Sequence, residues 1–353
     1  RRLPDEAPTR MVLRLALAQA LILNTPAHAA VATALPLVEG GPRRLVHAVL
    51  GRLLREGARL PDRPTLPDPW ATRWTAIWGE PVVAAAERAL AAAPPLDLIC
   101  RDPAAADDLR AAMGDEAISL LPTHIRLPAG TRVEALPGFA EGRFWVQDIA
   151  AALPARLLAP ATDARVLDMA AAPGGKTMQL AAAEAHVTAL DISGTRLARL
   201  RDNLARTGLD ADIVETDARR YRPDEVFDGI LLDAPCSATG IFRRHPDVLH
   251  LRAPNRMTET LALQAVLLDH AATLTKPGGT LVYAVCSLEP REGEDQLEAF
   301  LTRTPGWHVD PPPPGALPDE LIPKGDSTVR TLPGQFADRG GLDGFFMARL
   351  TKG

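Results

Sequence analysis

The sequence predicts an α/β protein whose largest part is a doubly wound, mostly parallel sheet. Five short apolar runs between residues 164 and 287 alternate with helical stretches, as in βαβ units: "ARVLDMA", "HVTALDI", "ADIVETD", "FDGILLDA" and "GTLVYAVCS". Residues 10–90, by contrast, are rich in alanine and leucine at helical spacing and show no strand-like alternation. We therefore expect an all-helical unit over residues 1–90, a small α+β segment over residues 91–145 and the parallel sheet over residues 146–353.

The composition is typical of a soluble globular protein in a reducing compartment. Of the 353 residues, 46% are hydrophobic and 24% are charged, which is ordinary for a folded soluble chain. The three cysteines, Cys100, Cys236 and Cys286, are odd in number and lack CxxC or Cys/His spacing. This pattern argues against a disulfide framework and against a zinc site. We therefore expect a cytoplasmic protein without a bound metal.

Charge and hydropathy narrow the class of partner. The net charge of −5 argues against a uniformly basic nucleic-acid binder, but it leaves room for a local patch that binds phosphates. No uninterrupted apolar stretch reaches the ~18 residues that a membrane-spanning helix needs. The apolar run "MVLRLALAQALIL" is shorter than this and carries Arg14. We therefore expect no membrane partner and interpret this run as a buried helix.

The helical part contains three tryptophans at a spacing of four residues. Trp70, Trp74 and Trp78 fall on one face of a predicted helix. We interpret this face as core packing rather than as a platform for base stacking. Beyond it, runs such as "LDLIC" and "THIRLPAG" alternate with turn residues from Pro94 to Trp145, which indicates the small α+β segment.

The first predicted strand of the sheet runs into "DMAAAPGGKT", which has the character of a ligand-binding loop. Small residues and two glycines let the backbone approach a ligand, and the N–H groups of the following helix favour a polar or anionic group. A phosphate-binding P-loop would need glycine where Ala170 stands, and a dinucleotide GxGxxG is absent. Lys176 in this loop is conspicuous because the chain has only four lysines. We therefore expect another nucleoside-type cofactor.

Acidic residues end the next two predicted strands. Asp191 follows the loop by about twenty residues, where an acid can accept hydrogen bonds from a ribose diol. Asp217 ends the third strand and suits either of two roles, a contact with the amino group of adenine or an N-cap for the following "ARRY". The residues alone leave this choice open.

The ordered motifs of residues 130–350 resemble the NOP/SUN family of RNA cytosine-5 methyltransferases, and in particular its bacterial branch that acts on small-subunit ribosomal RNA. The segments that carry the resemblance are "GRFWVQD", "AAAPGGKT", "LDIS", "LLDAPCSATGIFRRHPD", "KPGGTLVYAVCSLEPREGE" and "DGFFMARL". Two positions depart from the family pattern: Ala170 replaces a frequent cysteine and Val285 replaces the usual threonine. The helical part, with "LRLALAQALILNTPAHAAV" and "RRLVHAVLGRLLREG", looks like the later part of a NusB-like RNA-binding domain, so we expect its first helices to be missing.

The resemblance implies a Rossmann-like class I methyltransferase domain, an RRM-like α+β segment and S-adenosylmethionine as cofactor. The residues that it places around the methionine and ribose are Ala170, Ala171, Ala172, Pro173, Gly174, Gly175 and Lys176. It also implies that Asp191 binds the ribose hydroxyls, that Asp217 faces the adenine and that Asp233 lies by the methyl-transfer site. We add Arg196, in the helix after Asp191, to the cofactor-binding residues.

The chemistry of cytosine gives a reason for two cysteines, each placed after an apolar, strand-like run. Carbon 5 of cytosine is a poor nucleophile, so a group must first add to carbon 6, and a thiolate suits this step. The hydrogen on carbon 5 must then leave before the thiol is eliminated, which requires a base. The resemblance assigns the nucleophile to Cys286 and assistance in product release to Cys236, while Asp233 is placed to hydrogen-bond to N3 of the base. We expect Cys100 to be a small buried side chain.

The basic residues after the first of these motifs are candidates for contact with RNA. We expect Arg243, Arg244 and His245 to contact phosphates, with pairing to nearby carboxylates as the alternative. The expected substrate is 16S ribosomal RNA, bound by a monomer, and a family member acting on tRNA is the nearest alternative. A DNA cytosine-5 methyltransferase would lack a cysteine at position 286, and an amino-group methyltransferase would carry Asp/Asn-Pro-Pro-aromatic in place of "DAPC". A non-catalytic RNA-binding assembly factor that retains cofactor binding is the remaining alternative.

Overall fold

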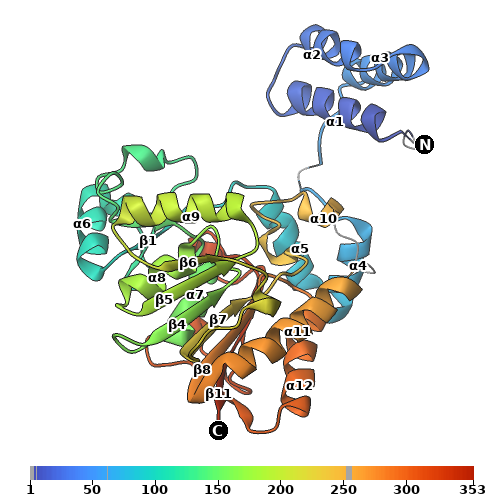
Figure 1. The fold of residues 1–353 in the computed structure, drawn as a ribbon. Helices are drawn as coiled ribbons and strands as arrows, with labels where there is room; N and C mark the ends of the chain where they lie inside the picture. Colours follow the sequence, from blue (N-terminus) through green and yellow to red (C-terminus); the bar gives the residue numbers. More distant parts are fainter. Residues whose placement is uncertain (1–3, 5, 62, 252–256) are drawn as a thin grey trace. The chain divides into compact units, whose positions relative to one another are not determined.

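The computed structural model describes residues 4, 6–61, 63–251 and 257–353 and forms two compact units, Arg1–Pro64 and Thr65–Gly353. The first unit is all helical, as predicted (Figure 1). Its helices are α1 (Ala7–Leu21), α2 (Ala27–Ala34) and α3 (Gly40–Arg55), with a 3-10 turn at Leu35–Leu37. They bury one small apolar cluster, which includes Val12, Ala16, Val46 and Leu50.

The second unit begins with the two helices that carry the tryptophans, α4 (Asp68–Trp78) and α5 (Glu80–Leu90). Trp70 and Trp74 are buried, so the prediction of core packing is confirmed for these two. The indole N–H of Trp70 donates to the backbone oxygen of Leu249 at 2.8 Å. The Trp74 ring lies 5.7 Å from the ring of Phe242. These contacts place α4 and α5 in the second unit. The sequence had instead predicted that they belong to one helical unit over residues 1–90.

A small three-stranded sheet follows, in the segment predicted to be α+β. Its elements are β1 (Leu96–Cys100), α6 (Pro103–Met113), β2 (His124–Leu127) and β3 (Phe144–Val146). The strands are antiparallel in the order β2-β1-β3. Asp102 caps α6 by accepting a hydrogen bond from the amide of Ala105 at 2.7 Å, which fixes where the helix begins.

The main sheet has the order β10-β11-β8-β7-β4-β5-β6, with β9 paired to β11. Its strands are β4 (Arg165–Met169), β5 (His186–Asp191), β6 (Asp212–Glu215), β7 (Phe227–Asp233), β8 (Thr275–Val285), β9 (Trp307–Asp310), β10 (Val329–Thr331) and β11 (Phe345–Lys352). All five predicted strands are present and parallel, which confirms the Rossmann-like fold class. Because β4 pairs with β5 on one side and β7 on the other, the strand order reverses at β4. Ligands bind at such a reversal in open α/β sheets.

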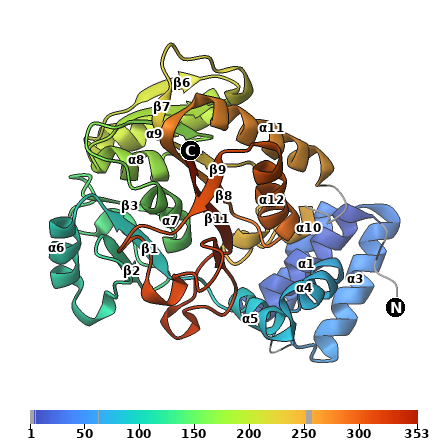
Figure 2. The ribbon, with the colours of Figure 1, turned by 90° about the horizontal axis from the view of Figure 1, so that it is seen from below.

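Helices cover both faces of this sheet. They are α7 (Ile149–Leu158), α8 (Gly175–Ala182), α9 (Gly194–Thr207), α11 (Thr258–Leu274) and α12 (Glu294–Arg303). The short α10 (Val248–Leu251) packs instead in the cluster that contains Trp70 and Trp74. Short 3-10 turns lie at Gly114–Glu116, Val133–Ala135, Ala218–Arg220, Thr239–Ile241, Pro290–Glu292, Asp319–Leu321 and Ala337–Arg339. Figure 2 shows α11 and α12 on one side of β8, β9 and β11 and α7 on the other.

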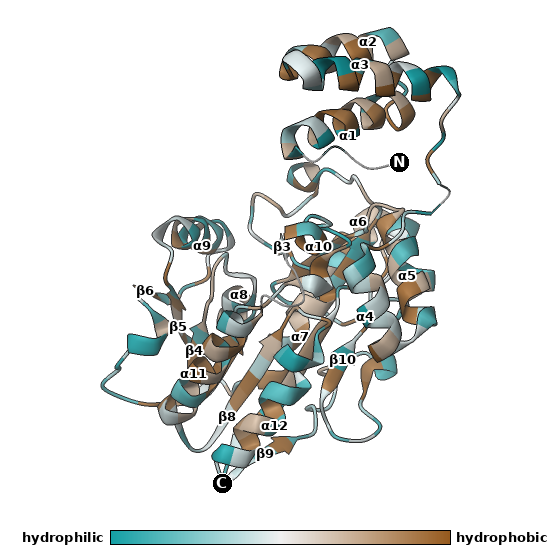
Figure 3. Ribbon diagram, turned by 90° about the vertical axis from the view of Figure 1, so that its right-hand side faces the viewer, coloured by the Kyte–Doolittle hydropathy of each residue, from teal (hydrophilic) through white to brown (hydrophobic). Residues whose placement is uncertain are grey.

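Side-chain alternation along the strands builds the two apolar layers. Leu231 and Val282 pack in the cluster that contains α7, whereas Leu232 and Tyr283 pack in the cluster that contains α11. Both faces are therefore apolar, as is usual for a parallel sheet between helices (Figure 3). Among the described residues, no helix is long and apolar enough to cross a membrane.

Candidate active site

The predicted cofactor loop lies between the end of β4 and the start of α8. Ala170 and Gly174 have positive φ values of 62° and 108°, and a Cβ on Gly174 would lie 3.1 Å from Cγ of Leu200. Glycine at position 174 therefore allows the loop to turn tightly against α9. The peptide bond between Ala172 and Pro173 is cis. The loop leads directly into the free amide groups at the N-terminus of α8.

Asp191, at the end of β5, is bonded to this loop. Its carboxylate is buried and accepts hydrogen bonds from the amides of Ala172 at 3.2 Å and Ser193 at 2.9 Å. Arg196 Nη1 lies 3.0 Å from Asp191 Oδ2, and the same guanidinium donates to the backbone oxygen of Ala172. The structure therefore brings Asp191, Arg196 and the loop together, while their contacts with a cofactor remain a prediction.

Asp217 lies on the neighbouring strand end and caps the turn at Ala218–Arg220. It accepts a hydrogen bond from the amide of Arg219 at 3.0 Å and pairs with Arg219 Nη2 at 2.6 Å. The hydrogen bond from the Arg219 side chain lowers the pKa of Asp217. The structure thus shows the capping role, and the contact with adenine stays a prediction.

Lys176 and Asp233 form an ion pair across the strand reversal. Lys176 Nζ lies 2.6 Å from Asp233 Oδ2, and its side chain is only 12% exposed. Burial disfavours the charged ammonium, but the Asp233 carboxylate outweighs this effect and raises the pKa of Lys176. The lysine that stands out in the sequence is therefore a cation held at the carboxyl edge of the sheet.

The two cysteines that follow β7 and β8 are in contact. Cys236 Sγ lies 3.4 Å from Cys286 Sγ, although 50 residues separate them in the chain. The strands are parallel neighbours with Asp233 opposite Ala284, so their ends lie at the same edge of the sheet. Both side chains are partly exposed. The hydrogen bond with Cys286, followed by burial, raises the pKa of Cys236 well above its ordinary value.

Cys100 differs from this pair, as predicted. It lies in β1 and is buried. Burial raises its pKa to about 12, and the negative charge of Asp102 acts in the same direction. The thiol of Cys100 is therefore a small apolar side chain of the α+β segment.

Two buried carboxyl groups near these residues, those of Asp168 and Glu292, were not among the predicted site residues. Asp168 is fully buried at the end of β4; Thr177 Oγ1 donates to its Oδ2 at 2.6 Å, and its Oδ1 has no partner in the described part of the chain. Glu292 is fully buried and accepts hydrogen bonds from the residues after the two cysteines, Ser237 and Ser287. The sequence signals were an acid within the apolar run before the loop and a serine after each cysteine.

The arginines of "FRRHP" are bound to carboxylates. Arg243 is buried; its Nη2 lies 2.6 Å from Asp148 Oδ2, and its Nε lies 2.6 Å from Asp343 Oδ1. Arg244 Nη2 lies 2.8 Å from the same Asp148 oxygen. For Arg243 the structure therefore shows the alternative interpretation, pairing with carboxylates, because its guanidinium is bonded to Asp148 and Asp343 and is closed to solvent. Arg244 and His245 line the cavity described next.

A cavity of about 460 Å³ lies beside the cofactor loop, and neither Asp191 nor Cys236 nor Cys286 is among its lining residues. Its walls include the cofactor loop, Asp168, Lys176, Asp233 and Trp145. The size is suitable for a nucleoside-type ligand. The unpaired oxygen of Asp168 and the amides at the start of α8 can receive the ammonium and carboxylate groups of an amino acid. The donors and acceptors present therefore fit S-adenosylmethionine.

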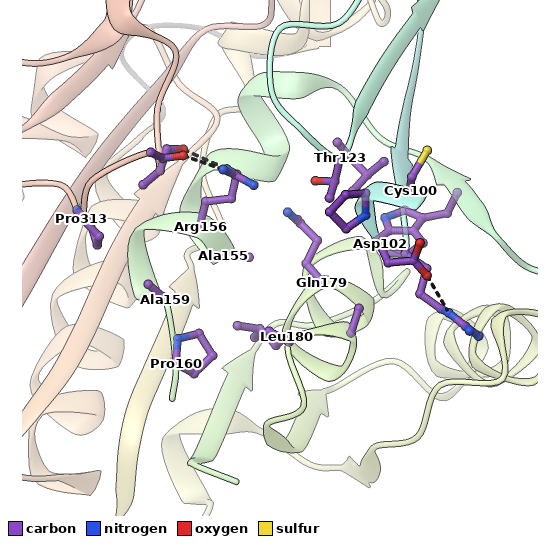
Figure 4. A pocket seen from close by; sticks show the side chains of 18 of the residues that line it. Cys100, Asp102, Thr123, Ala155, Arg156, Ala159, Pro160, Gln179, Leu180 and Pro313 are labelled. Atoms are coloured by element: carbon purple, nitrogen blue, oxygen red, sulfur yellow. Dashed lines mark hydrogen bonds and ion pairs between the residues drawn. The ribbon is translucent and has the colours of Figure 1, made fainter. Parts of the chain in front are cut away.

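A second cavity of about 440 Å³ lies between β1, α7, α8 and the loop 313–316 (Figure 4). Arg156 closes one side of it by donating to the backbone oxygens of Gly315 and Ala316, at 2.6 and 2.9 Å. Gln179 also lines it. This cavity contains none of the predicted site residues.

Comparison with known proteins agrees with the motif resemblance. The family model of the 16S rRNA methyltransferase RsmB/F matches residues 155–351. Ribosomal RNA small subunit methyltransferase B of Salmonella arizonae is 45% identical over 236 residues, which are 65% of this chain and 52% of that protein. The chain therefore spans about half the length of the curated relatives that it matches.

Solved structures share the fold. PH0851 aligns with a TM-score of 0.80 and 26% identity, over 98% of this chain and 82% of that one. NSun6 from Pyrococcus horikoshii aligns with a TM-score of 0.70 and 19% identity, over 81% of this chain and 98% of that one. The chain belongs to the 16S rRNA methyltransferase RsmB/F family, a family of S-adenosylmethionine-dependent enzymes.

Proposed function

We propose that this protein methylates carbon 5 of a cytosine in RNA, with 16S ribosomal RNA as the substrate, through a covalent adduct to Cys286. The observation that carries the proposal is the 3.4 Å contact between the Cys236 and Cys286 thiols. The Lys176–Asp233 pair lies at the same edge of the sheet and lines the ligand cavity. This arrangement suits a reaction that uses one thiol to attack and another group to complete the release of product.

In the proposed reaction, the Cys286 thiolate adds to carbon 6 of the base, and carbon 5 becomes nucleophilic. S-adenosylmethionine supplies the electrophilic methyl group when it is bound. Carbon 5 takes this methyl group as the S–CH3 bond breaks and S-adenosylhomocysteine leaves. A water molecule then takes the proton from carbon 5, the electron pair of that C–H bond restores the double bond between carbons 5 and 6, and the Cys286–carbon 6 bond breaks to return the thiolate. Cys236 assists this release. Asp233, paired with Lys176, is the residue that we propose at the N3 edge of the base; a hydrogen bond to N3 requires the proton of this pair to be on Asp233.

The substrate assignment follows the relatives. The matching protein of Salmonella arizonae is named for methylation of small-subunit ribosomal RNA. We propose the same substrate for this chain, with the unit Arg1–Pro64 as a NusB-like RNA-binding part and with the protein acting as a cytoplasmic monomer. Arg244 and His245, on the wall of the cavity, are the proposed phosphate contacts of the "FRRHP" motif.

A denaturing gel tests the covalent chemistry. Wild-type protein and the variants Cys286→Ala and Cys236→Ala are incubated with S-adenosylmethionine and unmethylated 16S ribosomal RNA. Cys236→Ala should methylate carbon 5 and then accumulate as a protein–RNA adduct, whereas Cys286→Ala should form no adduct and no 5-methylcytosine. Cys100→Ala serves as the control, because its thiol is buried in the α+β segment. An adduct from Cys286→Ala alone would contradict the assignment of the nucleophile.

A further inference from the structure

The two touching thiols differ in the charged groups that act on them. On the side of Cys236, the Glu292 carboxylate accepts a hydrogen bond from the Ser237 amide at 2.8 Å and from the Ser237 hydroxyl at 2.5 Å. It also accepts a hydrogen bond from the Ser287 hydroxyl at 2.6 Å. Because Ser237 follows Cys236 and Ser287 follows Cys286, one buried carboxylate is bonded to both cysteine loops.

Glu292 is an acceptor in every one of these contacts. A fourth donor, Gln264 Nε2, lies 3.3 Å from its Oε1. Hydrogen bonds from amides and hydroxyls to both oxygens are those that an ionised carboxylate makes. In the described part of the chain it forms no ion pair, whereas Glu289, equally buried, is paired with Arg73. Among the described residues, Glu292 therefore has hydrogen-bond donors but no direct ion-pair partner.

On the side of Cys286, the nearby charge is positive. The ammonium of Lys176 interacts electrostatically with Cys286 while its Nζ lies 2.6 Å from Asp233. A second cation, Arg330, donates from Nη1 to the backbone oxygen of Ser287 at 2.5 Å and is paired with Glu294. The hydroxyl of Tyr283 donates to the backbone oxygen of Glu292 at 2.5 Å. Burial raises the pKa of this tyrosine well above its ordinary value, so it stays neutral. The electrostatic potential is therefore more positive at Cys286, on the side of Lys176, than at Cys236, on the side of Glu292.

We propose that Glu292 is a positioning residue that keeps Cys236 as the neutral thiol and thereby places the thiolate on Cys286. Cys286 loses its proton to solvent, and the S–H of Cys236 donates to the Cys286 sulfur across the 3.4 Å contact. The hydrogen bonds to both loops hold the sulfur atoms at this separation. The use of the thiolate as nucleophile rests on the proposed function, whereas the location of the charge can be measured without RNA.

Alkylation by iodoacetamide measures this charge, because the thiolate is the reactive form. The probe is added to the free protein between pH 6 and pH 9, and mass spectrometry gives the initial rate at each cysteine. We expect Cys286 to react first at pH 7, Cys236 to react at least about tenfold more slowly, which corresponds to one pKa unit, and the buried Cys100 to stay unmodified. Equal rates at Cys236 and Cys286 in the wild type would overturn the proposal.

Variants at position 292 separate the charge from the packing. Glu292→Gln keeps the size but removes the charge, so alkylation of Cys236 at pH 7 should rise about tenfold. Glu292→Asp keeps the charge and should retain the wild-type order of reactivity. Glu289→Gln is the matched control, since it neutralises a buried carboxylate of the same loop that bonds to Arg73 and Trp74 and leaves in place the hydrogen bond from the Glu289 backbone amide to Ser287. It should lower the Tm without changing the order of reactivity. An unchanged order in folded Glu292→Gln would refute the role of Glu292.

A variant that leaves Glu292 in place covers the case in which Glu292→Gln does not fold. In Cys286→Ser the second thiol is absent, so Glu292 is the anion that remains beside Cys236. Cys236 should still react slowly at pH 7, and rapid alkylation would overturn the proposal. Failure of the gel assay with RNA, combined with the expected order of alkylation, would instead refute the proposed function alone.

Discussion

Oγ1 of Thr177 donates a hydrogen bond to Oδ2 of Asp168 at 2.6 Å, at the point where β4 and α8 meet. The other carboxyl oxygen, Oδ1, has no partner in the described part of the chain, and Asp168 lines the ligand cavity. Burial raises the pKa of Asp168 to about 7, although Thr177 and Lys176 act in the opposite direction. Without a ligand, this carboxyl group therefore makes the fold less stable once the pH is high enough to ionise it.

The first prediction concerns stability against pH in Asp168→Asn. Between about pH 4 and pH 7 the unfolded chain loses the Asp168 proton and the folded chain keeps it, so wild-type stability falls as the pH rises through this window. The shift from 3.8 to about 7 corresponds to roughly 4 kcal/mol. The asparagine side chain does not titrate, so the variant does not lose this stability. The unfolding free energy of Asp168→Asn minus that of wild type should therefore increase by about this amount from pH 4 to pH 8.

Urea titrations at the two pH values measure this difference. All five tryptophans lie after residue 64, so tryptophan fluorescence reports on the larger unit, Thr65–Gly353. A constant difference in unfolding free energy between wild type and Asp168→Asn from pH 4 to pH 8 would show that Asp168 titrates normally.

The second prediction concerns the cofactor. Asp191→Ala should weaken S-adenosylmethionine binding by about 1.5 to 3 kcal/mol, because hydrogen bonds from the ribose to a charged acceptor are lost. The variant also loses the hydrogen bond that Asp191 accepts from the amide of Ala172 in the loop. Calorimetry measures the affinity, and Asp202→Ala, on the exposed face of α9, is the control. Equal affinity of Asp191→Ala and wild type would remove Asp191 from the cofactor site.

The third prediction concerns Lys176. In Lys176→Met, Asp233 loses its cation, and we expect kcat for methyl transfer to fall by about 100-fold, the usual effect of removing one electrostatic group from a reacting centre. Lys276→Met is the matched control. Lys276 Nζ, on β8, lies 2.7 Å from Asp228, on β7, in a more exposed pair than that of Lys176 and Asp233. Both variants remove one lysine–aspartate pair, so similar single-turnover rates would mean that the Lys176 pair is structural.

The fourth prediction concerns Arg243. Removal of its guanidinium leaves the buried carboxylates of Asp148 and Asp343 without this partner, which should destabilise the larger unit by about 3 to 5 kcal/mol. Since Arg243 is closed to solvent, the salt dependence of RNA binding by the folded variant should match that of wild type. Arg244→Ala, in contrast, should reduce the salt slope. A reduced slope in Arg243→Ala would restore its predicted contact with phosphate.

The parallel sheet and the meeting of Cys236 with Cys286 were predictable because they depend on local signals. Apolar runs that end in polar residues specify parallel strands, and such strands end at one edge of the sheet. Contacts between side chains that are far apart in the chain cannot be predicted from such local patterns. The burial of Arg243 depends on Asp148 and Asp343, which lie about 95 and 100 residues away in the chain and in different elements. The sequence therefore indicated which residues gather, and packing decided which of them face solvent.

The grouping of α4 with the larger unit depends on contacts of the same long-range kind. The sequence of an alanine- and leucine-rich helix shows which face is buried but does not identify the element that packs against that face. Trp70 and Trp74 were assigned to a core by their spacing, but the partners of that core, Phe242 and Leu249, are more than 160 residues away. Helical periodicity thus predicted the buried face, whereas the identity of the covering surface required the fold.

The attachment of α4 to the segment behind Cys286 limits how the enzyme can be shortened. Arg73 and the indole N–H of Trp74 both bond to Glu289, and the indole of Trp78 donates to the backbone oxygen of Leu288 at 3.0 Å. A recombinant fragment that starts at residue 91 would remove the partners of the Glu289 carboxylate and expose the apolar surface around Leu288, three residues or fewer from Cys286. Expression libraries and crystallisation fragments should therefore be cut before Thr65, and α4 should be treated as part of the minimal catalytic unit.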